Sequence, residues 1–191
     1  MTAEDVRAAV LVAPDHFELR SFRVPAVDDD SAVVAVELCG VCGTDRKYAS
    51  GALPAPYPMI LGHEIVARVE AIGSRAAERW RLAVGDRVVV ESSIPCWSCS
   101  ACRRGAYPLC PTKGGYGTRL STAVEPGLWG GMAERMFVAP GSILHRIPAR
   151  MPAEVAVGIP VLANGLQWLV RRGGLGPGGR ARRTSAPPCR P

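Results

Sequence analysis

Four cysteines, Cys96, Cys99, Cys102 and Cys110, follow one another with the spacing C-x2-C-x2-C-x7-C. Thiolates this close in sequence can surround one tetrahedral ion, and Zn²⁺ is the commonest metal held by four sulfurs. A site with four protein ligands leaves no coordination position open for a substrate, so its role is structural. The spacing therefore predicts a lobe that folds around a structural zinc ion.

Two other interpretations of the four cysteines remain. Pro111 follows Cys110, as in the cysteine runs of iron–sulfur proteins, but the last gap here is seven residues instead of three, and no second set of four follows. Disulfides need an oxidising compartment, whereas Met1–Asp5 carries two acids and no basic signal-peptide region. We therefore expect a cytoplasmic protein with reduced thiols, in which zinc is favoured over both alternatives.

A second group of residues with metal-binding chemistry lies earlier in the chain. Cys39 and Cys42 stand just after a predicted strand, and His63 and Glu64 stand just before another. A cysteine, a histidine and a carboxylate at strand ends can converge on one ion. The residues alone leave other interpretations open, because Cys39 and Cys42 could form a redox pair and an isolated histidine is more often structural.

The elements that must position these residues are mostly short strands. The first 150 residues alternate apolar stretches with Gly and Pro, which predicts an all-β barrel rather than alternating strands and helices. The likeliest helices are Pro152–Ala156 and Leu162–Arg172. The predicted strands are Arg7–Val12, Glu18–Val24, Ala32–Leu38, Ile65–Ala71, Arg87–Glu91 and Ala133–Val138.

The charge distribution argues against nucleic acid as a partner. The net charge of +6 arises from the six arginines between Arg171 and the end, because residues 1–170 hold 17 basic and 17 acidic side chains. A neutral globular part has no general electrostatic footprint for phosphates. The longest uncharged run, Val155–Val170, has 16 residues and is too short for a typical membrane span, so we expect no membrane segment either.

Several motifs together resemble one family. They are the four-cysteine lobe, Cys42-Gly43-Thr44-Asp45, Gly62-His63-Glu64, Gly85-Asp86-Arg87-Val88 and Gly130-Gly131-Met132-Ala133-Glu134. Their order resembles that of the zinc-dependent medium-chain alcohol dehydrogenases, and the resemblance covers residues 1 to about 178. It implies a mainly β fold, a GroES-like, partly open β-barrel with a four-cysteine zinc lobe and a few short helices, as the catalytic domain over residues 1–172. It also implies hydride transfer from a small-molecule alcohol to NAD or NADP.

The resemblance assigns metal ligands for a catalytic zinc. Cys42 and His63 would ligate the ion, Glu64 lies next to it and ligates it in some members, and Cys39 would be a bystander. Relatives supply a further ligand in the stretch that corresponds to residues 159–163, which here carry no coordinating side chain. Glu64, water or, more remotely, Asn164 would complete the site.

The same resemblance assigns roles in positioning and proton transfer. Asp45 would fix the orientation of His63 and raise its basicity. Thr44 would pass the proton of the substrate hydroxyl outward. Lys47 stands where many members carry a relay histidine, and an ammonium is a poorer proton shuttle near neutral pH unless burial lowers its pKa. We expect Lys47 to be either a substitute relay or an ordinary surface lysine.

The C-terminal part departs from the family. Members are about twice as long and continue into a nucleotide-binding domain, whereas residues 173–191 are rich in Gly, Arg and Pro and are expected to form a disordered tail. The glycines at 174, 176 and 179 match a dinucleotide fingerprint without its flanking strand and helix, so no cofactor-binding residue is predicted. The alternative function is a truncated, catalytically inactive zinc-binding domain. Oligomers are possible.

Overall fold

The computed structural model of the protein describes residues 5–175, and the chain divides into two compact units at the Gly158–Ile159 junction. The domain boundary expected after residue 172 stays a prediction, and most of the expected tail at 173–191 lies outside the described residues.

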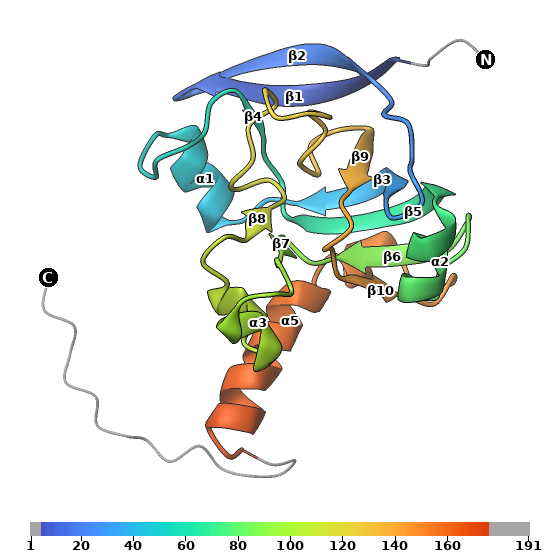
Figure 1. Ribbon diagram of the computed structural model, residues 1–191. Helices are drawn as coiled ribbons and strands as arrows, with labels where there is room; N and C mark the ends of the chain where they lie inside the picture. The colour runs from blue at the N-terminus through green and yellow to red at the C-terminus, as the bar shows by residue number, and fades with distance from the viewer. Residues whose placement is uncertain (1–4, 176–191) are drawn as a thin grey trace, which may run out of the picture. The chain divides into compact units, whose positions relative to one another are not determined.

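The first unit is mainly β, as the sequence predicted (Figure 1). Within the described residues its strands form a three-stranded sheet of order β2-β1-β4, a five-stranded sheet of order β10-β6-β5-β3-β9 and a two-stranded pair, β7-β8. All the pairings are antiparallel. The strands are β1 (Asp5–Ala13), β2 (His16–Arg23), β3 (Ala32–Gly40), β4 (Met59–Ile60), β5 (Glu64–Ile72), β6 (Arg87–Val90), β7 (Ser93–Ile94), β8 (Gly114–Gly115), β9 (Arg135–Val138) and β10 (Leu144–Arg146).

Alternating and continuous apolar patterns explain which strands are half-buried and which are central. In β1, Val6, Ala8 and Val10 are fully buried or nearly so, while the residues between them are more exposed. This alternation is what a strand with one face on a core requires. By contrast, β6 lies between β5 and β10, and all four of its residues are buried. Both faces of this strand are therefore covered. The main core gathers apolar residues of β3, β5, β6 and β9 with Leu82, Tyr116 and Trp129.

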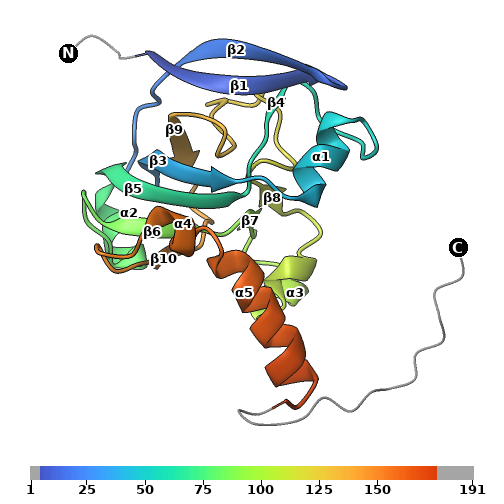
Figure 2. The ribbon, with the colours of Figure 1, turned by 180° about the vertical axis from the view of Figure 1, so that it is seen from behind.

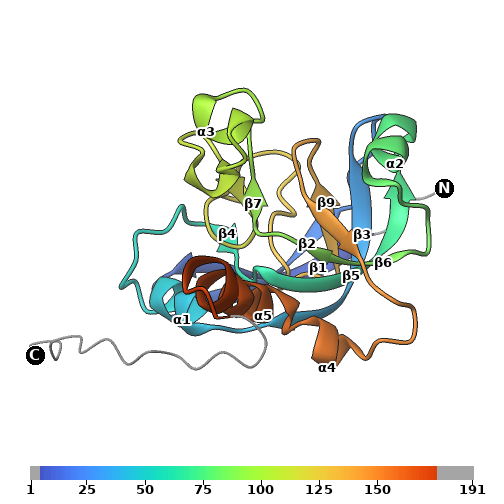
Figure 3. The same ribbon diagram turned by 90° about the horizontal axis from the view of Figure 1, so that it is seen from below.

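The helices of the first unit are short and stand at sheet edges and loops. Figure 3 shows β7 leading into the part of the chain that carries α3, and Figure 2 shows α4 on the viewer's side of the five-stranded sheet, near β6. The helix predicted at Pro152–Ala156 corresponds to α4, whereas α1 and α2 were not predicted. These elements are α1 (Gly43–Ala49), α2 (Ser74–Trp80), α3 (Ser100–Arg103), the 3-10 turn η1 (Tyr107–Leu109) and α4 (Ala153–Ala156).

Arg87, from the Gly85-Asp86-Arg87-Val88 motif, ties the five-stranded sheet to the segment before α4. Its side chain is only 8% exposed, and its Nη2 lies 2.6 Å from an oxygen of Glu37 on β3. Its Nη1 donates to the carbonyl oxygens of Ala149 at 2.9 Å and Met151 at 2.6 Å. A planar guanidinium suits this role because it has five donors in a fixed geometry. The motif is therefore explained by packing and hydrogen bonding.

The described part of the second unit is helical: α5 (Ile159–Leu166) continues as a π-helix, η2 (Gln167–Arg172). The helix expected at Leu162 therefore begins three residues earlier, at Ile159. Pro160 was expected to precede the helix, but proline is well tolerated in a first helical turn, where its missing N–H has no intrahelical acceptor.

One stretch among residues 5–175 passes a length and composition test for a membrane span. Ala153–Arg172 has 20 residues and a mean hydropathy of 1.4 in its apolar window. Core helices of soluble proteins pass the same test. The expectation that the sequence holds no membrane segment is therefore not confirmed.

Candidate metal centres

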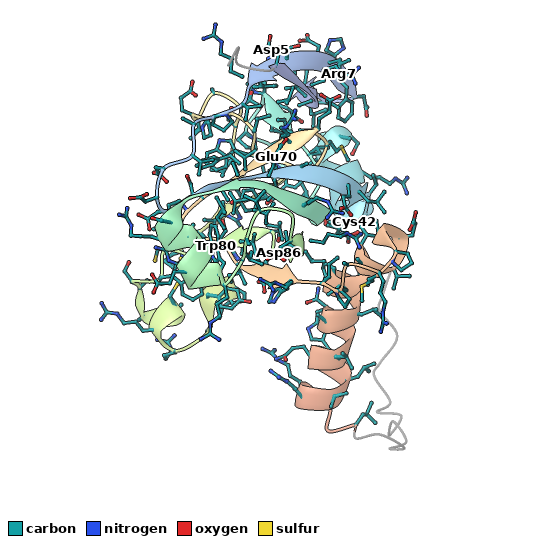
Figure 4. The ribbon with its side chains drawn as sticks, turned by 90° about the vertical axis from the view of Figure 1, so that its right-hand side faces the viewer. Asp5, Arg7, Cys42, Glu70, Trp80 and Asp86 are labelled. Atoms are coloured by element: carbon teal, nitrogen blue, oxygen red, sulfur yellow. The ribbon has the colours of Figure 1, made fainter. Side chains whose placement is uncertain are left out.

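The antiparallel pairing of β3 and β5 brings Cys42 and His63 together. Gly40, at the end of β3, pairs with Glu64, at the start of β5, so the residues just beyond these ends meet. Figure 4 shows Cys42 where the chain leaves β3. Cys42 Sγ and His63 Nε2 are 3.2 Å apart. For a zinc ion with bond lengths of about 2.3 Å to sulfur and 2.0 Å to nitrogen, tetrahedral geometry places the two ligand atoms about 3.5 Å apart, so this pair fits a shared zinc ligand set.

Asp45 is the buried carboxylate behind this pair. Its side chain is 2% exposed, and its two oxygens accept hydrogen bonds from the backbone N–H groups of Cys42 at 2.9 Å and Gly62 at 3.2 Å. Oδ1 also lies 3.3 Å from His63 Nδ1. Nδ1 is buried and has no well-aligned hydrogen bond within the described part of the chain, so the Asp45–His63 contact is mainly electrostatic. Asp45 thus lies where it can orient the imidazole.

The electrostatics of this pair keep Nδ1 protonated. Asp45 raises the pKa of His63 to about 8, against the opposing effect of burial. Burial acts to raise the pKa of Asp45, but His63 and the backbone N–H groups of Cys42 and Gly62 outweigh it and hold that pKa below its ordinary value. With Asp45 ionised and Nδ1–H facing it, Nε2 is the imidazole nitrogen left to face the Cys42 sulfur.

Helix α1 starts at this site through an unusual cap. Cys42 is the N-cap residue: its Sγ accepts a hydrogen bond from the Thr44 N–H at 3.2 Å, and the Asp45 carboxylate bonds back to the Cys42 N–H. This is the reciprocal arrangement of a capping box. The Thr44 N–H thus points at the sulfur that would ligate a metal. The sequence missed the helix because the usual N-cap residues are Ser, Thr, Asp and Asn, not Cys.

Two further residues were predicted for this site, Glu64 and Lys47. Cys42, Asp45 and His63 have ligand atoms within 4.8 Å of one another, and Glu64 is not a member of this group. The Glu64 carboxylate packs against the Cα of Gly40, where any side chain at position 40 would collide with it. Lys47 lies in the last turn of α1, and its carbonyl accepts a hydrogen bond from the Leu53 N–H at 3.1 Å.

Cys39 is partly buried and packs against two glycines beside the site. Its sulfur fills the space over the Cα atoms of Gly62 and Gly131, and a side chain at either glycine would strike it. Burial, and secondarily the charge of Asp45, raises the pKa of Cys39 to about 12. A thiol held neutral in this way packs as an apolar group and is a poor metal ligand. This environment agrees with the bystander role implied by the family resemblance.

The four-cysteine lobe has the geometry of a metal site. The sulfurs of Cys96, Cys99, Cys102 and Cys110 all lie within 4.8 Å of one another, and the Cys96 and Cys102 sulfurs are 4.0 Å apart. A tetrahedral zinc with bonds of about 2.3 Å separates its sulfurs by about 3.8 Å, whereas a disulfide separates them by about 2.05 Å. The described cysteines are free thiols, so the structure does not support the disulfide alternative.

Hydrogen-bond donors around the lobe sulfurs favour thiolates. Cys96 Sγ accepts from the Ser98 hydroxyl and from the Cys99 N–H, each at 3.4 Å, and Cys99 Sγ accepts from the Cys102 N–H at 3.4 Å. The Ser98 hydroxyl and the backbone N–H groups of Ser98 and Cys99 lower the pKa of Cys96 to about 5. Burial instead raises the pKa of Cys102. The set fits a metal because an ion at its centre would compensate the buried thiolate charge.

Four side chains that the sequence did not indicate connect the lobe to the rest of the first unit: Glu91, Trp97, Tyr107 and His145. Glu91 accepts a hydrogen bond from the Tyr107 hydroxyl at 2.8 Å and lies 2.7 Å from His145 Nε2 on β10. The Trp97 ring lies 5.7 Å from the Tyr107 ring at a tilt of 42°, and its Nε1 donates to the Gly141 carbonyl at 2.8 Å. These partners are 16 to 54 residues apart, so no local pattern could have indicated them.

Comparison with known proteins agrees with this architecture. The family described as "Alcohol dehydrogenase GroES-like domain" matches residues 28–149. The chain belongs to this family. The GroES-like β fold and the family resemblance expected from the sequence are thereby confirmed.

Individual relatives extend the comparison beyond the matched domain. The chain is 42% identical over 166 residues to "Probable alcohol dehydrogenase adh" of Mycobacterium tuberculosis, covering 85% of this chain and 45% of that protein. It is 34% identical over 163 residues to the erythritol/L-threitol dehydrogenase of Mycolicibacterium smegmatis, covering 80% and 43%. The structure of a candidate zinc-binding dehydrogenase of Sinorhizobium meliloti 1021 bound to NADP matches with a TM-score of 0.76 and 28% identity, covering 90% and 46%. The chain therefore spans a little under half the length of these relatives.

Proposed function

We propose that this chain is the zinc-binding catalytic half of an alcohol dehydrogenase, with Cys42 and His63 as ligands of a catalytic zinc. The observation that carries the proposal is the 3.2 Å approach of Cys42 Sγ to His63 Nε2 over the buried carboxylate of Asp45. Family membership supports the reaction class, and similarity to an NADP-bound protein supports a nicotinamide as the hydride acceptor. A bound zinc with an open position would polarise an alcohol oxygen and favour its alkoxide near neutral pH.

The residues of the chain have distinct parts in this proposal. Asp45 keeps Nδ1 of His63 protonated and so directs Nε2 to the metal side. The Thr44 N–H donates to Cys42 Sγ, and the Thr44 hydroxyl accepts the proton that leaves the substrate alcohol while it passes its own proton outward. Lys47, a few residues further along α1, is exposed, and its ammonium has no lone pair to accept a proton, so water is the proposed next acceptor on the path to solvent. Glu64 reaches the metal only by leaving its packing against Gly40.

The second ion in this proposal is structural. The four lobe cysteines would hold it, and the contacts of Tyr107 with Glu91 and of Trp97 with Gly141 keep the lobe fixed to the sheet. Structural zinc sites of this size contribute folding free energy directly, on the order of 10 kcal/mol. A second candidate function is a zinc-binding domain without turnover.

Metal counting and turnover test the proposal together. The 191-residue chain is purified from zinc-replete medium, and zinc is measured by inductively coupled plasma mass spectrometry for the unmodified protein, Cys42→Ser, His63→Gln and the matched control Cys39→Ser. We expect two zinc ions in the unmodified protein and in Cys39→Ser, and one in each ligand variant. Retention of two ions by Cys42→Ser and His63→Gln contradicts the ligand assignment. NAD- or NADP-dependent oxidation of alcohols supports the enzyme, and two zinc ions without turnover support the second candidate.

A further inference from the structure

The outer strand of the three-stranded sheet is an open edge. β2 borders only β1, and it is the outermost ribbon of that sheet in Figures 1 and 2. Two of its apolar side chains are exposed, Phe17 by 45% and Leu19 by 70%. An edge strand presents unpaired N–H and C=O groups that can bond to a further strand. Among residues 5–175, no backbone hydrogen bond occupies this edge of β2.

The neighbouring strand shows which residues of β2 present these groups. On β1, the Ala9 N–H donates to the Met132 carbonyl, and the Arg7 carbonyl accepts from the Glu134 N–H, so odd-numbered residues of β1 bond away from β2. Backbone groups alternate in direction along a strand, so the even-numbered residues of β1 bond to β2. They pair with even-numbered residues of β2. The odd-numbered residues of β2, including Leu19, therefore direct their N–H and C=O groups toward the open edge.

This geometry restricts how a second copy of the strand can pair with the first. In an antiparallel pair, the outward-facing odd residues of both copies must stand opposite each other. Near the middle of β2, three such registers exist. One places Glu18 opposite the second copy's Glu18 and another places Arg20 opposite its Arg20, and both set like charges against each other. The third centres on Leu19 and sets each Glu18 opposite an Arg20, which is the favourable arrangement.

The two charged side chains are already placed for such pairing. Arg20 Nε donates to Glu18 Oε2 at 2.8 Å within one chain, so both side chains project from the same face of the strand. Both are about 40% exposed and thus available to a second strand. In the Leu19-centred register they form non-hydrogen-bonded cross-strand pairs, the type in which side chains approach most closely. The exposed Leu19 side chains of the two copies stand opposite each other at the two-fold axis.

We propose that β2 is a dimerisation strand: two copies of the chain pair antiparallel through it, centred on Leu19, and form one continuous six-stranded sheet. Glu18 and Arg20 select the register, and Leu19 and Phe17 cover each other across the axis. The partner is a second copy because the strand is complementary to itself in both hydrogen-bond direction and charge. The interface is small, so its affinity is expected to be modest and its population concentration-dependent.

Charge reversal at the two positions tests the register. Glu18→Arg places arginine at both positions 18 and 20, and Arg20→Glu places glutamate at both. Analytical ultracentrifugation of the full chain over a concentration series should show a dimer for the unmodified protein. Each single variant should bind to itself at least about tenfold more weakly, since its cross-strand pairs become repulsive. An equimolar mixture of the two single variants should restore the dimer, because every cross-strand pair is then attractive.

Further variants separate this interface from general effects of charge or folding. The double variant Glu18→Arg/Arg20→Glu should dimerise like the unmodified protein. Arg150→Glu makes the same charge change at an exposed site outside the sheets and should leave dimerisation unchanged. Leu19→Pro removes an outward N–H without removing a bond to β1, so circular dichroism should show an intact fold while the dimer is lost. Any of three results would overturn the proposal. The unmodified protein could be monomeric, β2 could pair only with an unrelated extended peptide, or the mixture of single variants could fail to recover the dimer.

Discussion

Replacing Asp45 by asparagine isolates the contribution of the buried carboxylate to metal binding. The substitution keeps the size of the side chain but turns one acceptor oxygen into an amide donor. Both oxygens now accept: one from the Cys42 N–H at 2.9 Å, the other from the Gly62 N–H at 3.2 Å, with His63 Nδ1 at 3.3 Å. In either orientation, the new NH₂ group faces a donor at 2% exposure. The variant therefore loses one of these contacts and the negative charge that holds Nδ1–H.

The expected cost follows from this arrangement. Losing a carboxylate that orients a metal-ligating histidine typically lowers metal affinity about 10- to 100-fold, or about 1.4 to 2.7 kcal/mol. We expect Asp45→Asn to lower zinc affinity by this factor at the Cys42–His63 site, with no change at the four-cysteine site. The pKa of His63, held at about 8 mainly by Asp45, should fall toward its ordinary value in the same variant.

The assay distinguishes the two metal sites by competition. Zinc is titrated against a chromophoric chelator for the unmodified protein, Asp45→Asn and the control Asp29→Asn, whose carboxylate is 58% exposed at the surface. Two phases of zinc release are expected, and only the weaker-binding phase should shift in Asp45→Asn. Cobalt substitution gives a second readout through the thiolate absorption of each site. An unchanged affinity in Asp45→Asn, or an equal shift in the control, would refute the positioning role of Asp45.

Three further perturbations test other parts of the structure. Arg87→Met leaves three carbonyl oxygens and Glu37 without their donor, so the melting temperature should fall by about 5 to 10 °C; a melting curve like that of the unmodified protein would contradict this role. Glu91 raises the pKa of His145, so the ion pair stabilises the fold fully below the ordinary histidine pKa and is lost as the pH rises through the raised value. His145→Gln should therefore flatten the fall of melting temperature from pH 6.5 upward, as differential scanning fluorimetry would show. Cys99→Ser should remove one zinc ion and make the lobe susceptible to proteolysis, while the Cys42 site still binds cobalt.

Much of the β framework is predictable because its signal is local. The apolar stretches bounded by Gly and Pro correspond to β1, β2, β3, β5, β6 and β9, all of which lie within a few residues of their predicted bounds. The missed strands β4, β7, β8 and β10 have two or three residues each, which is too short for any periodicity to register. Each of these strands is recognised by its pairing with a neighbouring strand; Met59 of β4, for example, pairs with Leu11 of β1.

The candidate sites were predictable in their residues but not in their arrangement. Spacing indicated the four-cysteine lobe, and the structure brings its sulfurs together. The Cys42–His63 pair follows from the pairing of β3 with β5, which no local pattern reveals. The position of Glu64 against Gly40 and the contacts of Glu91 with Tyr107 and His145 also depend on long-range packing. The assignment of Cys42 and His63 as zinc ligands stays a prediction until metal is measured.

Anomalous X-ray diffraction at the zinc edge tests the central claim most directly. Crystals of the chain grown from zinc-replete protein should show two anomalous peaks. One should lie among the four lobe sulfurs, and the other should lie about 2.3 Å from Cys42 Sγ and about 2.0 Å from His63 Nε2. A peak in the lobe alone, with nothing between Cys42 and His63 at saturating zinc, would contradict the account of the catalytic site.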